Sequence, residues 1–102
     1  MRLVARLTEL IEGEADGARE YARLALELRG DGMQGAAATV LEMARQEAKH
    51  AESLHDVAVS AINARRDAGD AAPSGMEEYW EWRHGALIER MALAKQEIEL
   101  CK

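Results

Sequence analysis

Apolar residues recur at steps of three and four along most of the chain, the spacing that gathers them on one side of an α-helix. This pattern predicts three helices, over residues 3–30, 34–66 and 76–100. No segment shows the alternation of apolar and polar residues that is typical of a half-buried strand. Gly30-Asp31-Gly32 has the composition of a tight connection between antiparallel helices. We therefore expect an all-α fold, a long antiparallel helical hairpin followed by a third helix.

The chain divides into three predicted units. Residues 1–66 form the hairpin, residues 67–75 a turn-rich linker, and residues 76–102 a C-terminal helix for packing or oligomerisation. Ser74 is the predicted N-cap of the last helix, with Glu77 as its capping-box partner. The residues expected on the buried side of the helices are Leu3, Leu7, Leu10, Ile11, Ala18, Tyr21, Ala25 and Leu28, then Val40, Met43, Ala44, Ala51, Leu54, Val57, Ala58, Ala61 and Ile62, then Met76, Trp80, Leu87, Met91, Ala94 and Ile98.

Charged and polar side chains interrupt two of these stripes. Glu14 lies on the stripe of the first helix, and Glu47 and His50 lie three residues apart on that of the second. The first is 17 positions before Asp31 in the predicted turn, and the other two are 16 and 19 positions after it. An antiparallel hairpin therefore brings all three side chains to one level. Two acids and an imidazole together on an apolar stripe favour a bound cation, because unpaired buried charge is costly.

The ligand types restrict the metal. Carboxylate oxygen and imidazole nitrogen without a thiolate suit iron or manganese, with zinc as an alternative. Because Cys101 is the one cysteine, cysteine-based zinc and iron sites are excluded. One chain supplies half of a ferritin-like ligand set, which takes a Glu from each of two helices and Glu-x-x-His from each of two others. We therefore expect a homodimer or higher homo-oligomer in which four carboxylates balance the charge of two divalent cations.

Glu-x-x-His occurs twice more, as Glu52-His55 and Glu81-His84. The first pair is out of phase with the stripe of its helix, so we expect both side chains to face solvent. The second is interpreted as an exposed pair beside a packing Trp, and a further ligand pair is the alternative. Nothing at a matching level in the sequence requires Glu81-His84 to be a ligand pair.

Two glycines flank Glu14. Glycine in a helix interior costs about 1 kcal/mol relative to alanine. Gly13 and Gly17 indicate space for dioxygen, tolerated defects in the helix or, as we favour, close approach of a second chain. Trp82 is expected to pack at a helix–helix interface, and Cys101 is interpreted as a free terminal thiol.

Charge and hydropathy argue against several partner classes. The net charge is −6 and no basic run is longer than Arg65-Arg66, so nucleic acid is not an expected partner. Charged residues interrupt the first ten positions, unlike a signal peptide, and no apolar run approaches the ~20 residues of a membrane span. We expect a cytoplasmic protein without a membrane partner.

The segments IEGEADGAREYA, with Glu14 and Tyr21 seven residues apart, and EMARQEAKHAE, with Glu47 and His50, resemble the signatures of ferritin-like and rubrerythrin-like proteins. The resemblance covers residues 3–62, half of a bundle, and is strongest to the short encapsulated-ferritin branch. It implies that Glu14, Glu47 and His50 are the iron ligands and catalytic groups, with Tyr21 close by. It also implies two irons per dimer in a four-helix bundle, ferroxidase activity with dioxygen or peroxide, and an encapsulating shell protein as a further partner.

Two other functions stay open from the residues alone. One is metal binding without turnover, and the other is a helical interaction or oligomerisation module without metal. Iron storage, peroxide removal and iron sensing use the same ligands, so the sequence does not separate them.

Overall fold

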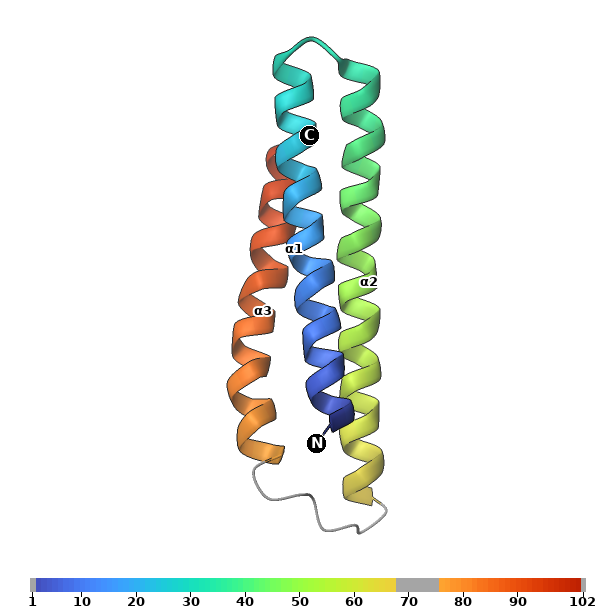
Figure 1. Cartoon of the computed structure of the whole chain (residues 1–102), viewed down its shortest axis with the longest axis vertical. Coiled ribbons are helices and arrows are strands. Elements are labelled where there is room, and N and C mark those ends of the chain that lie inside the picture. The colour runs from blue at the N-terminus through green and yellow to red at the C-terminus, as the bar shows by residue number, and fades with distance from the viewer. Residues whose placement is uncertain (1, 68–75, 102) are drawn as a thin grey trace.

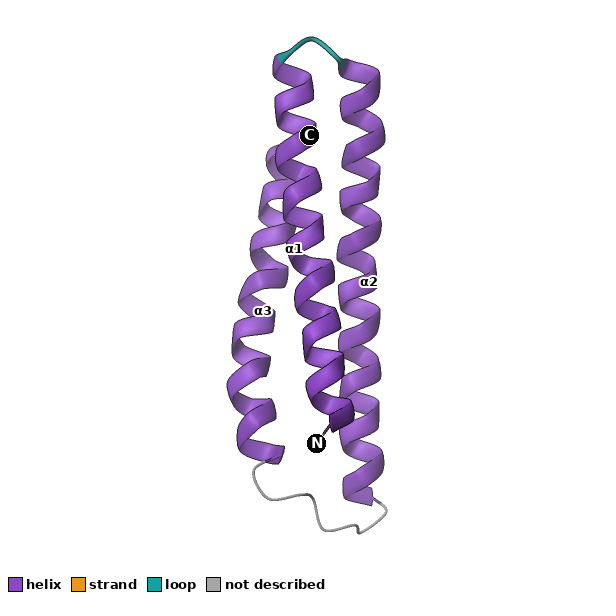
Figure 2. Cartoon of the chain, in the orientation of Figure 1, coloured by secondary structure: helices purple, strands orange, loops and turns teal. Residues whose placement is uncertain are grey.

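The computed structural model describes residues 2–67 and 76–101. Three α-helices, α1 (Arg2–Gly30), α2 (Gln34–Asp67) and α3 (Met76–Leu100), pack side by side in a rod of 57 × 18 × 18 Å (Figure 1). The described residues contain no strand, so the all-α prediction is confirmed (Figure 2). None of the described helices is long and apolar enough to cross a membrane. Apart from Asp67, the predicted linker and its N-cap Ser74 lie outside the described residues.

α1 and α2 are joined by the tight turn that the sequence predicts (Figure 2). The amide of Met33 donates to the carbonyl of Leu28 over 2.9 Å, and the amide of Gly32 donates to the carbonyl of Arg29 over 3.0 Å. Gly32 has a φ of 78°, the left-handed conformation that glycine adopts without steric cost. These features make a Schellman cap, which satisfies the last carbonyls of α1 and lets the chain reverse.

α1 packs against both other helices, which contact each other less extensively (Figure 1). Its buried side chains are mostly small: Val4, Leu7, Thr8, Ile11, Ala15, Ala18, Ala22 and Ala25. The residues of α2 buried in the same core are Ala37, Leu41, Ala44, Ala51, Ala58 and Ile62. Alanine at so many core positions lets the helix backbones approach closely.

Four residues predicted to be buried are exposed. Leu3, Leu10, Met43 and Val57 keep between 38% and 52% of their surface accessible, so the prediction is wrong for them in the single chain. The physical reason is that each helix of the hairpin carries two apolar lines about one position apart. Packing of the three helices turns the more alanine-rich line inward and leaves the other at the surface.

α3 buries the side that the sequence predicts. The confirmed core residues of this helix are Trp80, Leu87, Ala94 and Ile98. Trp82, expected to pack, is 70% exposed, because it lies two residues, or about 200°, around the helix from the buried Trp80. Cys101 is buried at the end of the core, where its thiol donates to the carbonyl of Ala22 over 3.1 Å.

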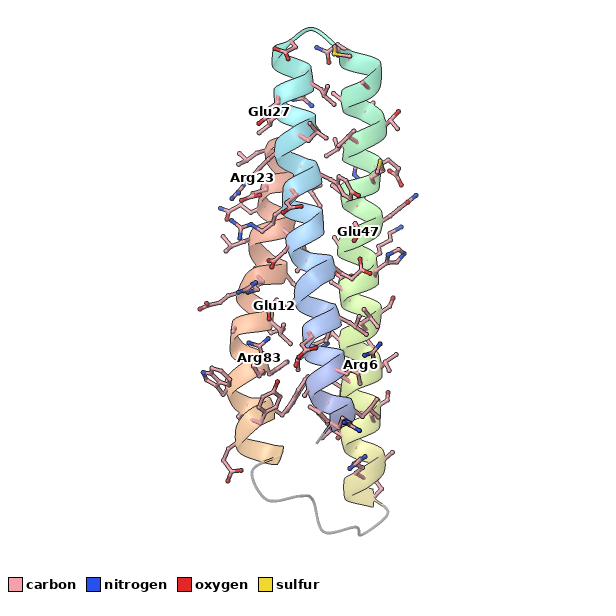
Figure 3. All side chains as sticks on the ribbon, viewed as in Figure 1. Arg6, Glu12, Arg23, Glu27, Glu47 and Arg83 are labelled. Carbon is pink, nitrogen blue, oxygen red and sulfur yellow. The ribbon has the colours of Figure 1, made fainter. Side chains whose placement is uncertain are left out.

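Ion pairs also connect α3 to α1. Arg83 pairs with Glu12, and Arg90 pairs with both Glu12 and Asp16 at 3.1 and 2.7 Å. Figure 3 shows the side chains of Glu12 and Arg83 next to each other between the two helices. Glu12 and Asp16 stand two residues on either side of Glu14, so α3 engages both acids that neighbour the predicted ligand.

Candidate metal centre

The side chains of Glu14, Glu47 and His50 meet at one level of the α1–α2 pair. One ligand atom from each residue lies within 4.8 Å of the other two. Nδ1 of His50 lies 3.7 Å from Oε2 of Glu14. Glu14 stands about 200° around α1 from both Glu12 and Asp16, which face α3. The three-residue cluster therefore lies on the side of the hairpin away from α3.

The cluster is partly open to solvent. The side chain of His50 is 60% exposed and that of Glu14 is 29% exposed. Oε2 of Glu14 is nonetheless buried and has no hydrogen-bond partner in the part of the chain that the structure describes. A buried carboxylate oxygen without a partner costs free energy, and a cation shared with Glu47 and His50 offsets that cost. The residues present therefore fit a bound cation.

Two carboxyl groups this close compete for one proton. Glu14 raises the pKa of Glu47 above its ordinary value, chiefly because the protonated Glu47 carboxyl group can donate a hydrogen bond to the Glu14 carboxylate. Partial burial and repulsion from the charge of Glu14 raise it further, whereas His50 lowers it. Carboxylates bind metal in the ionised form, so a bound cation displaces this proton and, in its place, offsets the repulsion between the two negative charges.

Gly17 makes room for one of the candidate ligands. A Cβ atom at this position would lie 3.2 Å from Oε2 of Glu47 and 3.8 Å from its Cδ. A Cβ atom at Gly13 would meet nothing within 4 Å. The two glycines that flank Glu14 in sequence therefore differ: Gly17 is in contact with the Glu47 carboxylate of the same chain, and Gly13 is in open space.

The cluster opens onto a strip of exposed apolar residues, which we name the open seam. Its exposed apolar members are Leu3, Leu10 and Leu24 on α1 and Met43 and Val57 on α2, and Gly17 and His50 occupy the positions that complete the seven-residue spacing on each helix. Glu14 and Glu47 stand between successive members. A seven-residue apolar repeat is the pattern of a helix–helix interface. In the described structure this strip is not covered by α3, which lies on the other side of α1.

Tyr21, predicted to lie beside the ligands, is half-buried and packs against the core cluster that contains Ala22 and Leu41. Among the described residues its hydroxyl makes no hydrogen bond to Glu14 or Glu47. Its role next to the metal stays a prediction.

The prediction that Glu52 and His55 both face solvent is wrong for His55. This side chain is 19% exposed, and its Nε2 lies 2.9 Å from Nε2 of His84 on α3. Glu52 is partly exposed and pairs with Lys95. Glu81 is exposed, as expected, whereas His84 is half-buried against the ring of a Trp. The signal for His55 was present in the sequence, because it lies between alanines of the core-facing line of α2.

Of the comparisons with known proteins, the one with protein families gave a match, and this match covers almost the whole chain. Searches among curated proteins and among solved structures gave no significant match. The sequence model of the Rubrerythrin family, however, matches residues 6–99. The match confirms the resemblance found in residues 3–62 and extends it through α3. On this match, the chain belongs to the rubrerythrin family.

Proposed function

We propose that the chain forms a homodimer that binds two ferrous ions between its copies and oxidises them with dioxygen or peroxide, with Glu14, Glu47 and His50 of each copy as ligands. The observation that carries the proposal is the buried, unpartnered Oε2 of Glu14 beside a second carboxylate and an imidazole. Membership of the rubrerythrin family supports a ferritin-like, iron-binding protein.

The donor set favours iron or manganese. Two carboxylates and one imidazole form a mostly oxygen-based set, which suits these ions better than a thiolate set would, and zinc accepts it as well. Three protein ligands leave further coordination positions free for an oxidant or water. The two carboxylates neutralise one divalent ion per chain.

A second copy supplies what the single chain lacks. When two open seams pair around a two-fold axis, they bury their exposed leucine, methionine and valine side chains and build a four-helix bundle. The bundle then contains four carboxylates and two imidazoles at one level. Pairing also covers His50, which is 60% exposed in the single chain. The apolar repeat on the open seam is the feature that supports this arrangement.

In this function the ferrous ions are the substrate. Two ferrous ions give one electron each to dioxygen, and two protons are taken up to form hydrogen peroxide; with peroxide as the oxidant, two electrons and two protons yield two waters. Glu47 releases its proton when a ferrous ion binds, and both carboxylates then favour the more highly charged ferric product. Gly17 keeps the space that lets the Glu47 carboxylate lie next to Glu14.

The proposal is tested by anaerobic loading with ferrous ion followed by exposure to air. We expect about one ferrous ion per chain and growth of ferric absorbance with oxygen uptake. Glu47→Gln is expected to lose both, whereas Glu52→Gln, a matched change on the same helix at a residue paired with Lys95, is expected to retain them. Unchanged oxidation in Glu47→Gln rejects the proposal. Metal uptake without oxygen consumption, read with an oxygen electrode, assigns metal binding without turnover instead.

A further inference from the structure

Two imidazoles from different helices meet at a point that the proposed function does not use. Nε2 of His55 on α2 lies 2.9 Å from Nε2 of His84 on α3. The rings are tilted by only 20° and their centroids are 5.0 Å apart, so the rings lie nearly end to end, with each nitrogen directed at the other. Both side chains are half-buried. We name these two residues the histidine pair; its α2 member faces the core, whereas His50 lies on the open seam.

Neighbouring groups hold both rings in orientation. The buried ring of Trp80 lies 4.9 Å from that of His84, tilted by 23°, and 6.1 Å from that of His55. On the other side of the His55 ring, Nδ1 lies 3.6 Å from Oδ1 of Asp56. A carboxylate near the second ring nitrogen is common at metal-binding histidines, because it keeps the proton on that nitrogen and leaves the other nitrogen free to bind.

We propose that His55 and His84 form a second metal site, which takes a late divalent transition-metal ion such as Zn²⁺, Ni²⁺ or Cu²⁺ through two imidazole nitrogens. A tetrahedral ion at about 2.0–2.1 Å from each nitrogen needs the nitrogens about 3.3–3.4 Å apart. The observed separation of 2.9 Å therefore has to open by roughly 0.4–0.5 Å, and both rings have to turn so that their lone pairs converge on the ion instead of pointing at each other. In the neutral pair, one imidazole carries its proton on Nε2. When the ion binds, this proton moves to Nδ1 of the same ring, so the pair releases no proton. Water completes the coordination.

The two sites select different ions. The site at Glu14, Glu47 and His50 is rich in oxygen and suits ferrous or manganous ion. The histidine pair offers nitrogen alone, and affinity for such ligands rises from Mn²⁺ and Fe²⁺ toward Ni²⁺ and Cu²⁺, with Zn²⁺ also bound well. In a mixture of these ions, Mn²⁺ and Fe²⁺ are therefore disfavoured more strongly at the histidine pair than at the oxygen-rich site.

An ion at the histidine pair joins α3 to the hairpin. Several polar contacts join α3 to α1, including the pairs of Arg83 and Arg90, and the Lys95–Glu52 pair and the histidine pair join α3 to α2. A metal bridge replaces one hydrogen bond between α2 and α3 with two coordinate bonds. The inference does not depend on ferrous oxidation, since none of its residues belongs to the first site.

The test removes the first site and observes the second in the full-length chain. Glu14→Gln, Glu47→Gln and His50→Asn remove the first site, and Trp82→Phe leaves Trp80 as the one tryptophan. Because His84 stacks on Trp80, Ni²⁺ is expected to quench its fluorescence to saturation at one ion per chain. Zn²⁺ is expected to displace Ni²⁺, restore the fluorescence and raise the melting temperature.

His84→Asn in the same background is the deciding variant. We expect its affinity for Ni²⁺ to fall at least tenfold and the Zn²⁺-dependent rise in melting temperature to disappear. His55→Asn is expected to behave in the same way, and it replaces the first variant if circular dichroism shows that His84→Asn has lost its helices. Equal affinity for Ni²⁺ in the parent and in a folded variant, or no stoichiometric quenching in the parent, overturns the proposal.

Discussion

Replacing Gly17 with alanine tests whether the position of the Glu47 carboxylate controls metal binding. The added Cβ atom would lie 3.2 Å from Oε2 of Glu47, closer than ordinary van der Waals contact. The carboxylate is the far end of a flexible side chain, so it moves by a few tenths of an ångström rather than forcing the helices apart. That same oxygen belongs to a candidate metal ligand, and a displacement of a few tenths of an ångström uses up most of the roughly 0.5 Å within which binding sites hold their ligands.

We expect this substitution to increase the stability of the fold and to decrease its affinity for metal. Alanine in place of glycine in a helix interior stabilises the folded chain by about 1 kcal/mol, which raises the melting temperature of a domain of this size by about 4–8 °C. The displaced carboxylate, in contrast, weakens metal binding. We expect a loss of about tenfold in affinity, or about 1.4 kcal/mol, at the low end of what misplaced supporting groups cost at metal sites.

The assay is calorimetric titration with Mn²⁺, which favours the oxygen-rich site, together with thermal melting of metal-free protein. Gly13→Ala is the matched control, because it makes the same change one turn earlier on α1 where a Cβ atom meets nothing within 4 Å. Both variants are expected to melt higher than the parent, and only Gly17→Ala to bind Mn²⁺ more weakly. Equal losses of affinity in the two variants, or none in Gly17→Ala, refute the steric argument.

Three further outcomes test other parts of the structure. Leu10→Glu adds a charge to the open seam at a residue that is 44% exposed, so the chain is expected to fold but to sediment as a monomer and to lose ferrous oxidation; a dimeric variant contradicts the proposed interface. As pH rises through the raised pKa of Glu47, the metal-free fold loses the stability that the shared proton contributes, whereas its affinity for Mn²⁺ increases. Calorimetric titration with Mn²⁺ in buffers of different ionisation enthalpy is expected to detect the release of this proton on binding. Binding without proton release contradicts a proton shared by Glu14 and Glu47. Arg90→Met removes the pairs with Glu12 and Asp16, and because these groups are more than a quarter exposed we expect a loss of only about 0.5–1 kcal/mol in thermal or urea unfolding, with Mn²⁺ affinity unchanged.

The level of the three candidate ligands could be worked out from sequence because it depends only on the turn and on the rise per residue. Once the hairpin reverses at Gly32, residues equally distant from the turn on α1 and α2 lie opposite each other, whichever sides of the helices face inward. This is why Glu14, Glu47 and His50 were expected together and are found within 4.8 Å of one another.

The inward side of α1 could not be worked out in the same way. Leu3 and Leu10 lie on the line that contains Glu14, and Val4 and Ile11 lie on a line one position later. Both lines have helical periodicity and similar hydrophobicity, so neither property decides between them. The structure buries Val4 and Ile11, because the position of α3 decides which line is central, and the sequence of α1 contains no information on that position.

The same ambiguity explains the error at His55. The angular position of His55 on α2 was compared with the line of residues that contains His50, and that line is exposed in the structure. On the other line, Ala51 and Ala58 are buried at 1% and 0% exposure, and His55 lies between them. The meeting with His84 depends in addition on how α3 docks, which periodicity within one helix does not specify.

The composition of the two lines explains why the ligands lie on the outer one. Ala18, Ala22 and Ala44 are fully buried between the helices of a single chain, and alanine has no side-chain atom that binds a cation. On the proposed function, the larger leucine, methionine and valine side chains of the open seam set a greater distance to the second copy, as a metal-bridged bundle needs. On the proposed function, each ion contacts both copies, so metal binding and dimerisation must strengthen each other by the same free energy. The apparent affinity for ferrous ion therefore increases with protein concentration until the dimer is fully formed, a dependence that a site complete within one chain does not have.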